Sequence, residues 1–230
     1  METVAIITAR GGSKRIPRKN IKTFCGKPII QYSIEAAIQS GAFDSVMVST
    51  EDKEIAEISK ACGADVPFMR SNETANDYAG TADVLLEVLE SYRAIGVDVS
   101  SFCCIYPTAP FVTADKLRKG MRLLNEKSAD SVIPVVQFSF PPQRGFVIDG
   151  ERIKIQYPQF FKCRSQDLRP AYHDCGQFYC ARVKPFLEHK LLIMTNTIPM
   201  IMPETEVQDI DNEKDWMIAE NKYRMMRGLA

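Results

Sequence analysis

Through the first 137 residues, short apolar segments rich in β-branched side chains alternate with segments of helical periodicity. Strand character is found at 3–8, 45–50, near 66, at 102–106 and at 131–136, and helical character at 28–40, at 52–62 and in stretches that begin at 81 and 113. This alternation is typical of βαβ units. We therefore predict an α/β fold with an open, mostly parallel sheet and helices on both of its faces.

The residues at the ends of these segments support the same division. Pro28 stands in the first turn of the first helical stretch and Gly41 directly after it, which is the usual asymmetry of helix ends. Asp52 precedes the second helical stretch, where its carboxylate can accept from free backbone N–H groups, and Gly63 follows that stretch.

The alternation ends after Gln137. Residues 138–173 include four prolines, many aromatic side chains and one expected hairpin at 146–155, which turns at Asp149-Gly150. Aromatic enrichment is typical of the centre of a protein interface. We predict that 138–173 is an arm that joins two copies in a homodimer, and a cap over the same chain is the alternative.

Regular structure is expected to return beyond the arm. Strand character reappears at 176–181 and 198–202, and an amphipathic helix is expected from 211 to about 226. The whole chain, 1–230, is expected to form one domain with the arm as an excursion from it.

Composition argues against several classes of protein. The 29 basic and 29 acidic residues of the 230-residue chain cancel, so no global field favours nucleic acid or a membrane surface as partner. No secretory signal and no run of about 18 apolar residues is apparent, so we expect a cytoplasmic protein. The seven cysteines match neither a disulfide framework nor common zinc spacings, and reduced thiols are expected.

One segment concentrates positive charge. No carboxylate occurs between Glu2 and Glu35, and this interval holds seven cations: Arg10, Lys14, Arg15, Arg18, Lys19, Lys22 and Lys27. The segment follows the first strand, and open α/β sheets bind ligands beyond the carboxyl ends of their strands.

A phosphate cradle is the function that this cationic segment favours. Gly11 and Gly12 allow backbone N–H groups to approach phosphate oxygens, and Ser13 adds a donor. A solvated surface loop is the alternative. The order of residues matches neither the GxxxxGK[ST] phosphate loop nor the GxGxxG dinucleotide motif, which disfavours those two classes.

The run from Ala9 to Asn20, ARGGSKRIPRKN, resembles the N-terminal signature of the CMP-sugar synthetases that act on sialic acids and related nonulosonic acids. Further matches follow along nearly the whole chain: Phe43-Asp44, Val48-Ser49-Thr50, Ile55-Ala56, Arg70, Asp77 and Pro107-Thr108-Ala109-Pro110. The segment 172–179, YHDCGQFY, is most similar to the pseudaminic acid branch. The resemblance implies transfer of CMP from CTP to an acidic nine-carbon sugar.

The resemblance also implies roles for individual residues. Arg10 and Lys19 would contact the triphosphate, Asn20 would lie near the nucleotide, and Arg70 and Thr81 would hold cytidine and ribose. The remaining expected nucleotide contacts are Ala9, Gly11, Gly12, Ser13, Lys14 and Tyr106. Two departures from the family pattern, Ser71 in place of Pro and Tyr106 in place of Gln, leave the contact to the base open.

Two aspartates near the C-terminus are the candidate metal ligands. Asp209 and Asp211 are two positions apart and share one face if the backbone is extended. Magnesium typically takes one or two protein carboxylates and completes its shell with water and phosphate oxygens. Mg²⁺ is the cofactor that the resemblance implies, with Asp209 and Asp211 as catalytic residues beside Arg10 and Lys19; a helix N-cap at Asp211 is the competing interpretation.

Candidate sugar contacts lie near the arm. The sugar carboxylate requires a cationic partner, which Arg164 or Arg169 could supply across a dimer interface. His173 and Gln177, in the segment similar to the pseudaminic acid branch, complete the expected sugar contacts. Zinc at His173 and its neighbouring cysteines is disfavoured by their spacing.

Three other functions stay open at this point. The first is a nucleotidyltransferase for 3-deoxy-manno-octulosonate or a neutral sugar phosphate. The second is a glycosyltransferase that uses Asp209-Ile210-Asp211 as its metal motif, although such enzymes do not require this density of charge after the first strand. The third is an inactive nucleotide-binding module.

Overall fold

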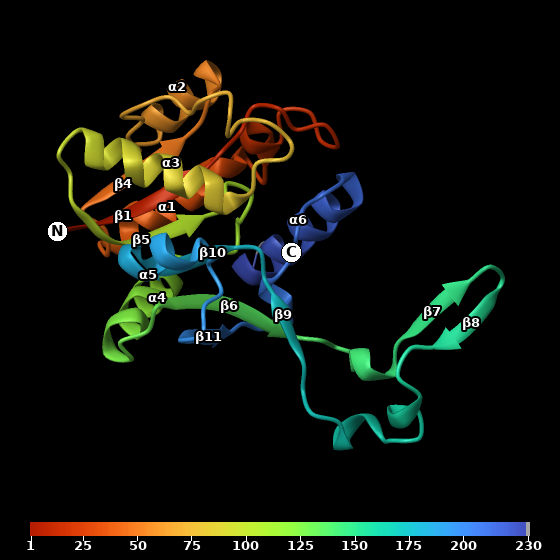
Figure 1. Cartoon of the computed structure of the whole chain (residues 1–230). Coiled ribbons are helices and arrows are strands. Elements are labelled where there is room, and N and C mark those ends of the chain that lie inside the picture. The colour runs from red at the N-terminus through yellow and green to blue at the C-terminus, as the bar shows by residue number, and fades with distance from the viewer. Residues whose placement is uncertain (229–230) are drawn as a thin grey trace.

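The computed structural model describes residues 1–228. A central sheet has the strand order β11-β6-β10-β5-β1-β4, with β9 paired to β6, and two further pairs, β2-β3 and β7-β8, lie outside it (Figure 1). The strands are β1 (Glu2–Thr8), β2 (Thr23–Phe24), β3 (Lys27–Pro28), β4 (Ser45–Ser49), β5 (Val99–Ile105), β6 (Ser131–Gln137), β7 (Phe146–Asp149), β8 (Arg152–Ile155), β9 (Tyr172–Asp174), β10 (Phe178–Arg182) and β11 (Thr197–Ile201).

The helices connect these strands and close the chain. The α-helices are α1 (Ile29–Ser40), α2 (Lys53–Ala61), α3 (Thr81–Ala94), α4 (Ala114–Glu126), α5 (Val183–His189) and α6 (Glu213–Arg227). Short 3-10 turns lie at Lys19–Ile21, Pro142–Arg144, Pro158–Phe160, Ser165–Asp167 and Glu204–Glu206. None of the helices among residues 1–228 is both long and apolar enough to cross a bilayer.

Successive side chains of a strand point to opposite faces of the sheet, so the sheet has a hydrophobic core on each face. This agrees with the prediction that helices cover both faces. Ala5 and Ile7 of β1 belong to the core beneath α1, α2 and α4, and Val4 and Ile6 belong to the core beneath α3 and α5. A third cluster joins α6 to α1 through the fully buried Phe24, whose ring packs edge-on against Trp216 at 5.4 Å. The prediction of a mostly parallel α/β sheet with helices on both faces is confirmed.

The direction of β10 is the main departure from a fully parallel sheet. The chain leaves β6 at Gln137, and after the excursion it returns as β9, antiparallel to β6. It therefore re-enters from the carboxyl edge, so β10 runs antiparallel to both β5 and β6. The predicted strand near Val66 is wrong, because only Asp65 forms an isolated bridge, to Met47. Helix α5 was not predicted.

Helix ends follow the side chains expected to cap them, with one correction. The Asp52 carboxylate accepts from the N–H of Ile55 at the start of α2, and Gly41 ends α1 in the left-handed conformation. At the last helix the N-cap is Asn212, whose side chain accepts from the N–H groups of Lys214 and Asp215. Asp211 is therefore not the cap, and its carboxylate is left for other contacts.

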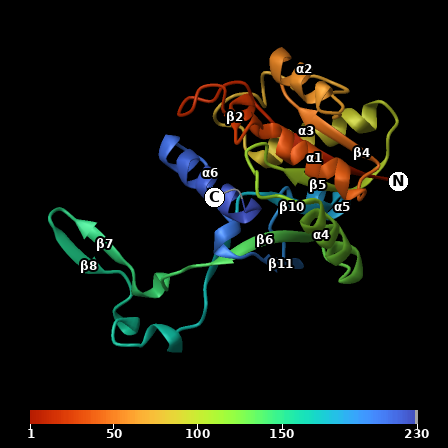
Figure 2. The same cartoon turned by 180° about the vertical axis from the view of Figure 1, so that it is seen from behind.

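Residues 138–171 extend away from the sheet in both views (Figures 1 and 2), whereas Tyr172 and His173, predicted as the end of the arm, pair with β6 as part of β9. The predicted hairpin is confirmed as β7 and β8, although every one of its eight residues is exposed. Ile148 and Ile153 expose 80% and 68% of their surfaces. A two-stranded hairpin with no covered face is marginal in water, and the exposure of its apolar residues matters for the assembly proposed below.

Candidate active site

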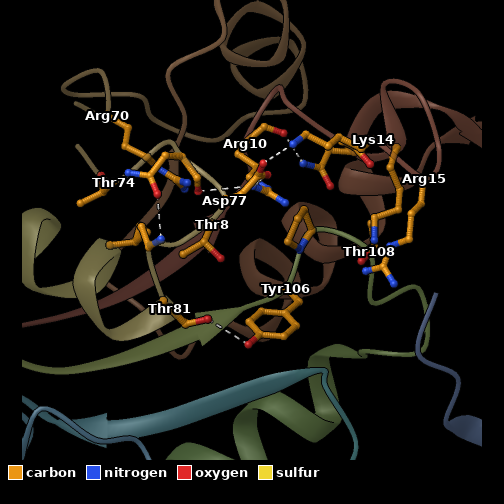
Figure 3. A pocket seen from close by; sticks show the side chains of 18 of the residues that line it. Thr8, Arg10, Lys14, Arg15, Arg70, Thr74, Asp77, Thr81, Tyr106 and Thr108 are labelled. Atoms are coloured by element: carbon orange, nitrogen blue, oxygen red, sulfur yellow. Dashed lines mark hydrogen bonds and ion pairs between the residues drawn. The ribbon is translucent and has the colours of Figure 1, made fainter. Parts of the chain in front are cut away.

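The carboxyl ends of β1 and β5 open onto a cleft of about 500 Å³ (Figure 3). The chain runs from β1 outward to β4 and then crosses to β5 on the other side of β1, so the cleft lies at a topological switch point, where open α/β sheets bind ligands. The lining residues are Thr8, Arg10, Ser13, Lys14, Arg15, Lys19, Asn20, Arg70, Thr74, Asn76, Asp77, Ala79, Gly80, Thr81, Val84, Tyr106, Pro107, Thr108 and Asp211.

The cationic segment directs part of its charge into this cleft. Arg10, Lys14, Arg15 and Lys19 line it. The other three cations are paired elsewhere: Arg18 with Asp52 and Glu54, Lys22 with Glu213, and Lys27 with Glu35. The sequence indicated where the positive charge is concentrated, and the contacts of the folded chain decide which cations face a ligand.

Contacts from the end of β4 shape the glycine loop. The Glu51 carboxylate accepts from the N–H of Gly11 at 2.6 Å, so this N–H, expected to face phosphate, is already engaged. Arg18, left-handed at φ 55°, donates to Asp52 at 3.0 Å. That hydrogen bond is the largest cause that lowers the pKa of Asp52 to about 2. The loop is therefore fixed by protein contacts alone.

Position 11 requires glycine because the Asp52 side chain lies close to its Cα, whereas position 12 has room for a side chain. A Cβ at Gly11 would lie 2.6 Å from the Asp52 carboxylate, which its bonds to Arg18 hold in place. We expect Gly11→Ala to destabilise the protein by about 1–3 kcal/mol and to reduce activity, as thermal melts and turnover would show. Gly12→Ala, with no atom within 4 Å of the added Cβ, is the matched control; equal effects in both variants would contradict this account.

Asn20 and Lys19 join the cationic loop to the rest of the cleft. The buried Asn20 side chain donates to the carbonyl of Arg10 at 2.8 Å. The Lys19 ammonium donates to the carbonyl of Ile210 at 2.7 Å and lies 4.0 Å from the Asp211 carboxylate. Burial lowers the pKa of Lys19. The loop and the aspartate pair, 190 residues apart in sequence, thus form one site.

Asp209 and Asp211 flank the buried Ile210. Burial, followed by the neighbouring charge of Asp211, raises the pKa of Asp209. Asp211 accepts from Arg15 at 2.7 Å and lines the cleft, whereas Asp209 is not among the lining residues. Two neighbouring carboxylates that repel each other at the edge of the cleft suit a divalent cation.

Any cation at this pair would need more ligands than the protein supplies. Among residues 1–228, no group of three or more His, Cys, Asp or Glu side chains is placed to hold a metal. This donor set fits magnesium, which commonly completes its octahedron with water and substrate phosphate oxygens.

The wall opposite the cationic loop carries the expected nucleoside contacts. Arg70 is 7% exposed and donates to the Ser49 carbonyl at 2.6 Å, so it is a buried cation and not a surface one. The hydroxyls of Thr81 and Tyr106 are 3.0 Å apart, and burial raises the pKa of Tyr106 (Figure 3). The Tyr106 ring also packs against that of Tyr179 at 5.5 Å. These residues form a rigid, partly apolar wall.

The four expected sugar contacts do not line the cleft of this chain. Arg164 lies in the arm, paired with Asp167 at 2.7 Å, and Arg169 is also exposed in the arm. His173 is exposed on β9, where its ring lies 4.7 Å from that of Phe138.

Gln177 requires a correction. Its side chain is 1% exposed and donates to the Glu206 carbonyl at 2.7 Å, so it supports the segment before Asp209 and does not face a sugar. Ala9 is likewise fully buried, and neither it nor Gly11 and Gly12 lines the cleft.

Several cleft residues were absent from the expected nucleotide contacts. Arg15 belongs to the cationic run but was not given that role. Asn76, Asp77 and Thr108 lie in loops without a periodic pattern. The resemblance already included Asp77 and Thr108, which is the one sequence signal that could have identified them.

The open α/β sheet and the cationic cleft at its switch point define a nucleotide-binding protein of the α/β class. Residues 4–144, more than half of the chain, match the family model described as cytidylyltransferase. The chain therefore belongs to the cytidylyltransferase family and is a nucleotidyltransferase.

Curated relatives match nearly the full length. The pseudaminic acid cytidylyltransferase of Campylobacter jejuni serotype O:2 is 37% identical over 226 residues, which is 98% of this chain and 97% of that protein. The CMP-N,N'-diacetyllegionaminic acid synthase of Legionella pneumophila is 32% identical over 227 residues, 96% of this chain and 95% of that protein.

Solved structures agree on the fold. A CMP:2-keto-3-deoxy-manno-octonic acid synthetase complexed with CTP superposes over 100% of both chains with a TM-score of 0.69 at 18% identity. At that identity the likeness supports the architecture alone.

Proposed function

We propose that this enzyme transfers CMP from CTP to the anomeric hydroxyl of an acidic nonulosonic sugar, with pseudaminic acid as the acceptor. The observation that carries the proposal is the cationic cleft at the β1–β5 switch point, in a chain similar to a pseudaminic acid cytidylyltransferase from end to end. CTP is abundant in the cytoplasm, where we expect the enzyme to act.

The residues of the cleft suit this reaction. Arg10, Lys14 and Lys19 would hold the triphosphate, and Arg70 and Thr81 would position the nucleoside. The sugar hydroxyl oxygen attacks the α-phosphorus, the bond from that phosphorus to the bridging oxygen breaks, pyrophosphate leaves, and the hydroxyl proton is released. Such transfers depend mainly on alignment and on neutralising oxygen charge, which fixed cations provide.

Asp209 and Asp211 would hold Mg²⁺ at the edge of this cleft. When bound, the ion would neutralise phosphate charge and favour ionisation of the attacking hydroxyl. The chain's own part is to present the two carboxylates, to orient Asp211 beside Arg15 and to connect this segment to the cationic loop through Lys19.

We further propose that residues 138–173 join two copies of the chain. The hairpin and the aromatic residues at its base expose many apolar side chains. A protein arm without a partner rarely leaves so much apolar surface in contact with water. Pairing of two arms would cover them, and it could bring Arg164 or Arg169 of one copy to the cleft of the other.

A charged side chain in the hairpin should prevent this pairing. We expect Ile148→Asp to convert a dimer into monomers while the central sheet stays folded, because Ile148 is 80% exposed and its cross-strand partner, Ile153, lies in the same hairpin. Light scattering coupled to size-exclusion chromatography measures the mass. Ile95→Asp, at an apolar residue 62% exposed and outside the arm, is the control. A wild-type monomer at micromolar concentration would refute the arm's role.

Pyrophosphate release tests the proposed reaction directly. The protein is mixed with CTP, magnesium and, in parallel, pseudaminic acid, N-acetylneuraminic acid or 3-deoxy-manno-octulosonate, and then with other nucleotides in place of CTP. We expect release only with CTP and fastest with pseudaminic acid. Faster release with another acid would reassign the acceptor, and CTP binding without turnover on any acid would contradict the proposal.

A further inference from the structure

Asp77 forms ion pairs with two cations of the cleft, Arg10 and Lys14, that could otherwise bind a phosphate group. It lies in the loop 71–80 and directs its carboxylate into the cleft (Figure 3). One carboxylate oxygen accepts from Arg10 at 2.7 Å, and the other is bonded to the ammonium of Lys14. Among the lining residues, Asp77 and Asp211 supply the carboxylates, and Asp211 is bonded to Arg15.

The conformation of the 71–80 loop depends on other residues. The Glu87 carboxylate of α3 accepts from both Ser71 and Thr74. The Asn76 side-chain oxygen accepts at 2.8 and 3.0 Å from the two backbone N–H groups that follow Asp77. Among residues 1–228, the Asp77 side chain bonds to Arg10 and Lys14 alone. Arg10 also donates to the Asn76 carbonyl at 3.3 Å. Removing the Asp77 charge leaves the Glu87 and Asn76 side-chain bonds that shape the loop in place.

A bound polyphosphate would compete with the Asp77 carboxylate for Arg10 and Lys14. Both are anions that accept hydrogen bonds from cations, and a carboxylate already paired with these two side chains repels an incoming phosphate. The Asp77 ion pairs are solvent-exposed, with 40% of the Asp77 side chain accessible, and exposed pairs contribute little to stability. A triphosphate carries more charge than one carboxylate and can displace it.

We propose that Asp77 sets the affinity of the site for nucleotide: its carboxylate takes the place of a phosphate group on Arg10 and Lys14 in the empty cleft, and the triphosphate binds by displacing it. The inference rests on the proposed use of CTP for its biological ligand. The competition between Asp77 and phosphate applies to any polyphosphate that binds Arg10 and Lys14.

Calorimetric titration of Asp77→Asn against the wild-type protein tests the proposal. Asparagine preserves shape and removes the charge. We expect the dissociation constants of CTP and of inorganic tripolyphosphate to fall by roughly 3- to 10-fold at low salt, with a smaller gain at high salt because screening weakens the competing pair. Binding of cytidine, which has no phosphate, should not change.

Glu73→Gln is the matched control, because Glu73 is an exposed acid of the same loop outside the cleft lining. It should leave all three affinities unchanged. Unchanged or weaker polyphosphate binding in Asp77→Asn would overturn the proposal and would make Asp77 a residue that orients Arg10 and Lys14. If that variant does not fold by circular dichroism, Asp77→Ser is judged by the same criteria.

The design separates this inference from the proposed function. Tighter tripolyphosphate binding in Asp77→Asn, in a wild-type protein that transfers no CMP, would retain the role of Asp77 and reject the reaction. If the wild type transfers CMP but Asp77→Asn binds tripolyphosphate no more tightly, the proposed reaction would be retained and the role of Asp77 rejected.

Discussion

Asp209→Asn should slow CMP transfer by on the order of 100- to 1,000-fold while the protein stays folded, comparable to the loss of one preorganised charge-stabilising group in other enzymes. Asp209 lies two residues before Asp211, whose negative charge raises its pKa, and the pair is the candidate magnesium site. Asparagine preserves the volume but removes the charge that would hold the ion. Turnover at saturating CTP and a thermal melt measure the two effects.

Glu213, the first residue of α6, provides the control for Asp209→Asn. Glu213 pairs with Lys22 on the surface, outside the cleft, so Glu213→Gln should leave turnover near the wild-type value. Full activity of Asp209→Asn at ordinary magnesium concentrations would refute the assignment of the metal to this pair.

Lys19→Ala should reduce kcat/KM for CTP by roughly 10- to 100-fold, since a hydrogen bond to a charged group is worth about 1.5–3 kcal/mol. Lys19 is mostly buried and has two roles in the structure, because its ammonium faces the cleft and binds the Ile210 carbonyl. The variant removes a triphosphate contact and also the link between the cationic loop and the 209–211 segment.

Initial-rate kinetics with varied CTP measure the loss in Lys19→Ala. Lys22→Ala is the matched control, because Lys22 belongs to the same cationic run but faces Glu213 and the Trp216 ring. It should leave kcat/KM almost unchanged. If the two variants lost activity equally, total charge and not the placement of Lys19 would be responsible.

Local sequence was sufficient for most of the regular structure. The inner strands β1, β5, β6 and β10 are mostly apolar because both of their faces are buried, and the helices carry Asp52, Gly41 and similar residues at their ends. The strand near Val66 failed because an apolar residue beside a turn does not by itself specify a pairing partner. Helix α5 was missed because it has only seven residues.

The cationic loop could also be identified from sequence. Seven cations without a compensating acid, placed directly after the first strand, indicate an anion site whatever the later contacts are. The run from Ala9 to Asn20 added the class of nucleotide through its resemblance to a family. The cation cluster and the family motif each lie within a short stretch of chain, so both can be recognised from sequence alone.

Only the tertiary structure decided which residues of that stretch face a ligand. Arg18 and Arg15 are equivalent in sequence, yet Arg18 is bound by Asp52 of the β4–α2 turn and Arg15 reaches Asp211. Gln177 appeared available for a sugar and is buried against the Glu206 carbonyl. These outcomes depend on partners far away in sequence, and no local pattern encodes how distant segments meet at the carboxyl edge of the sheet.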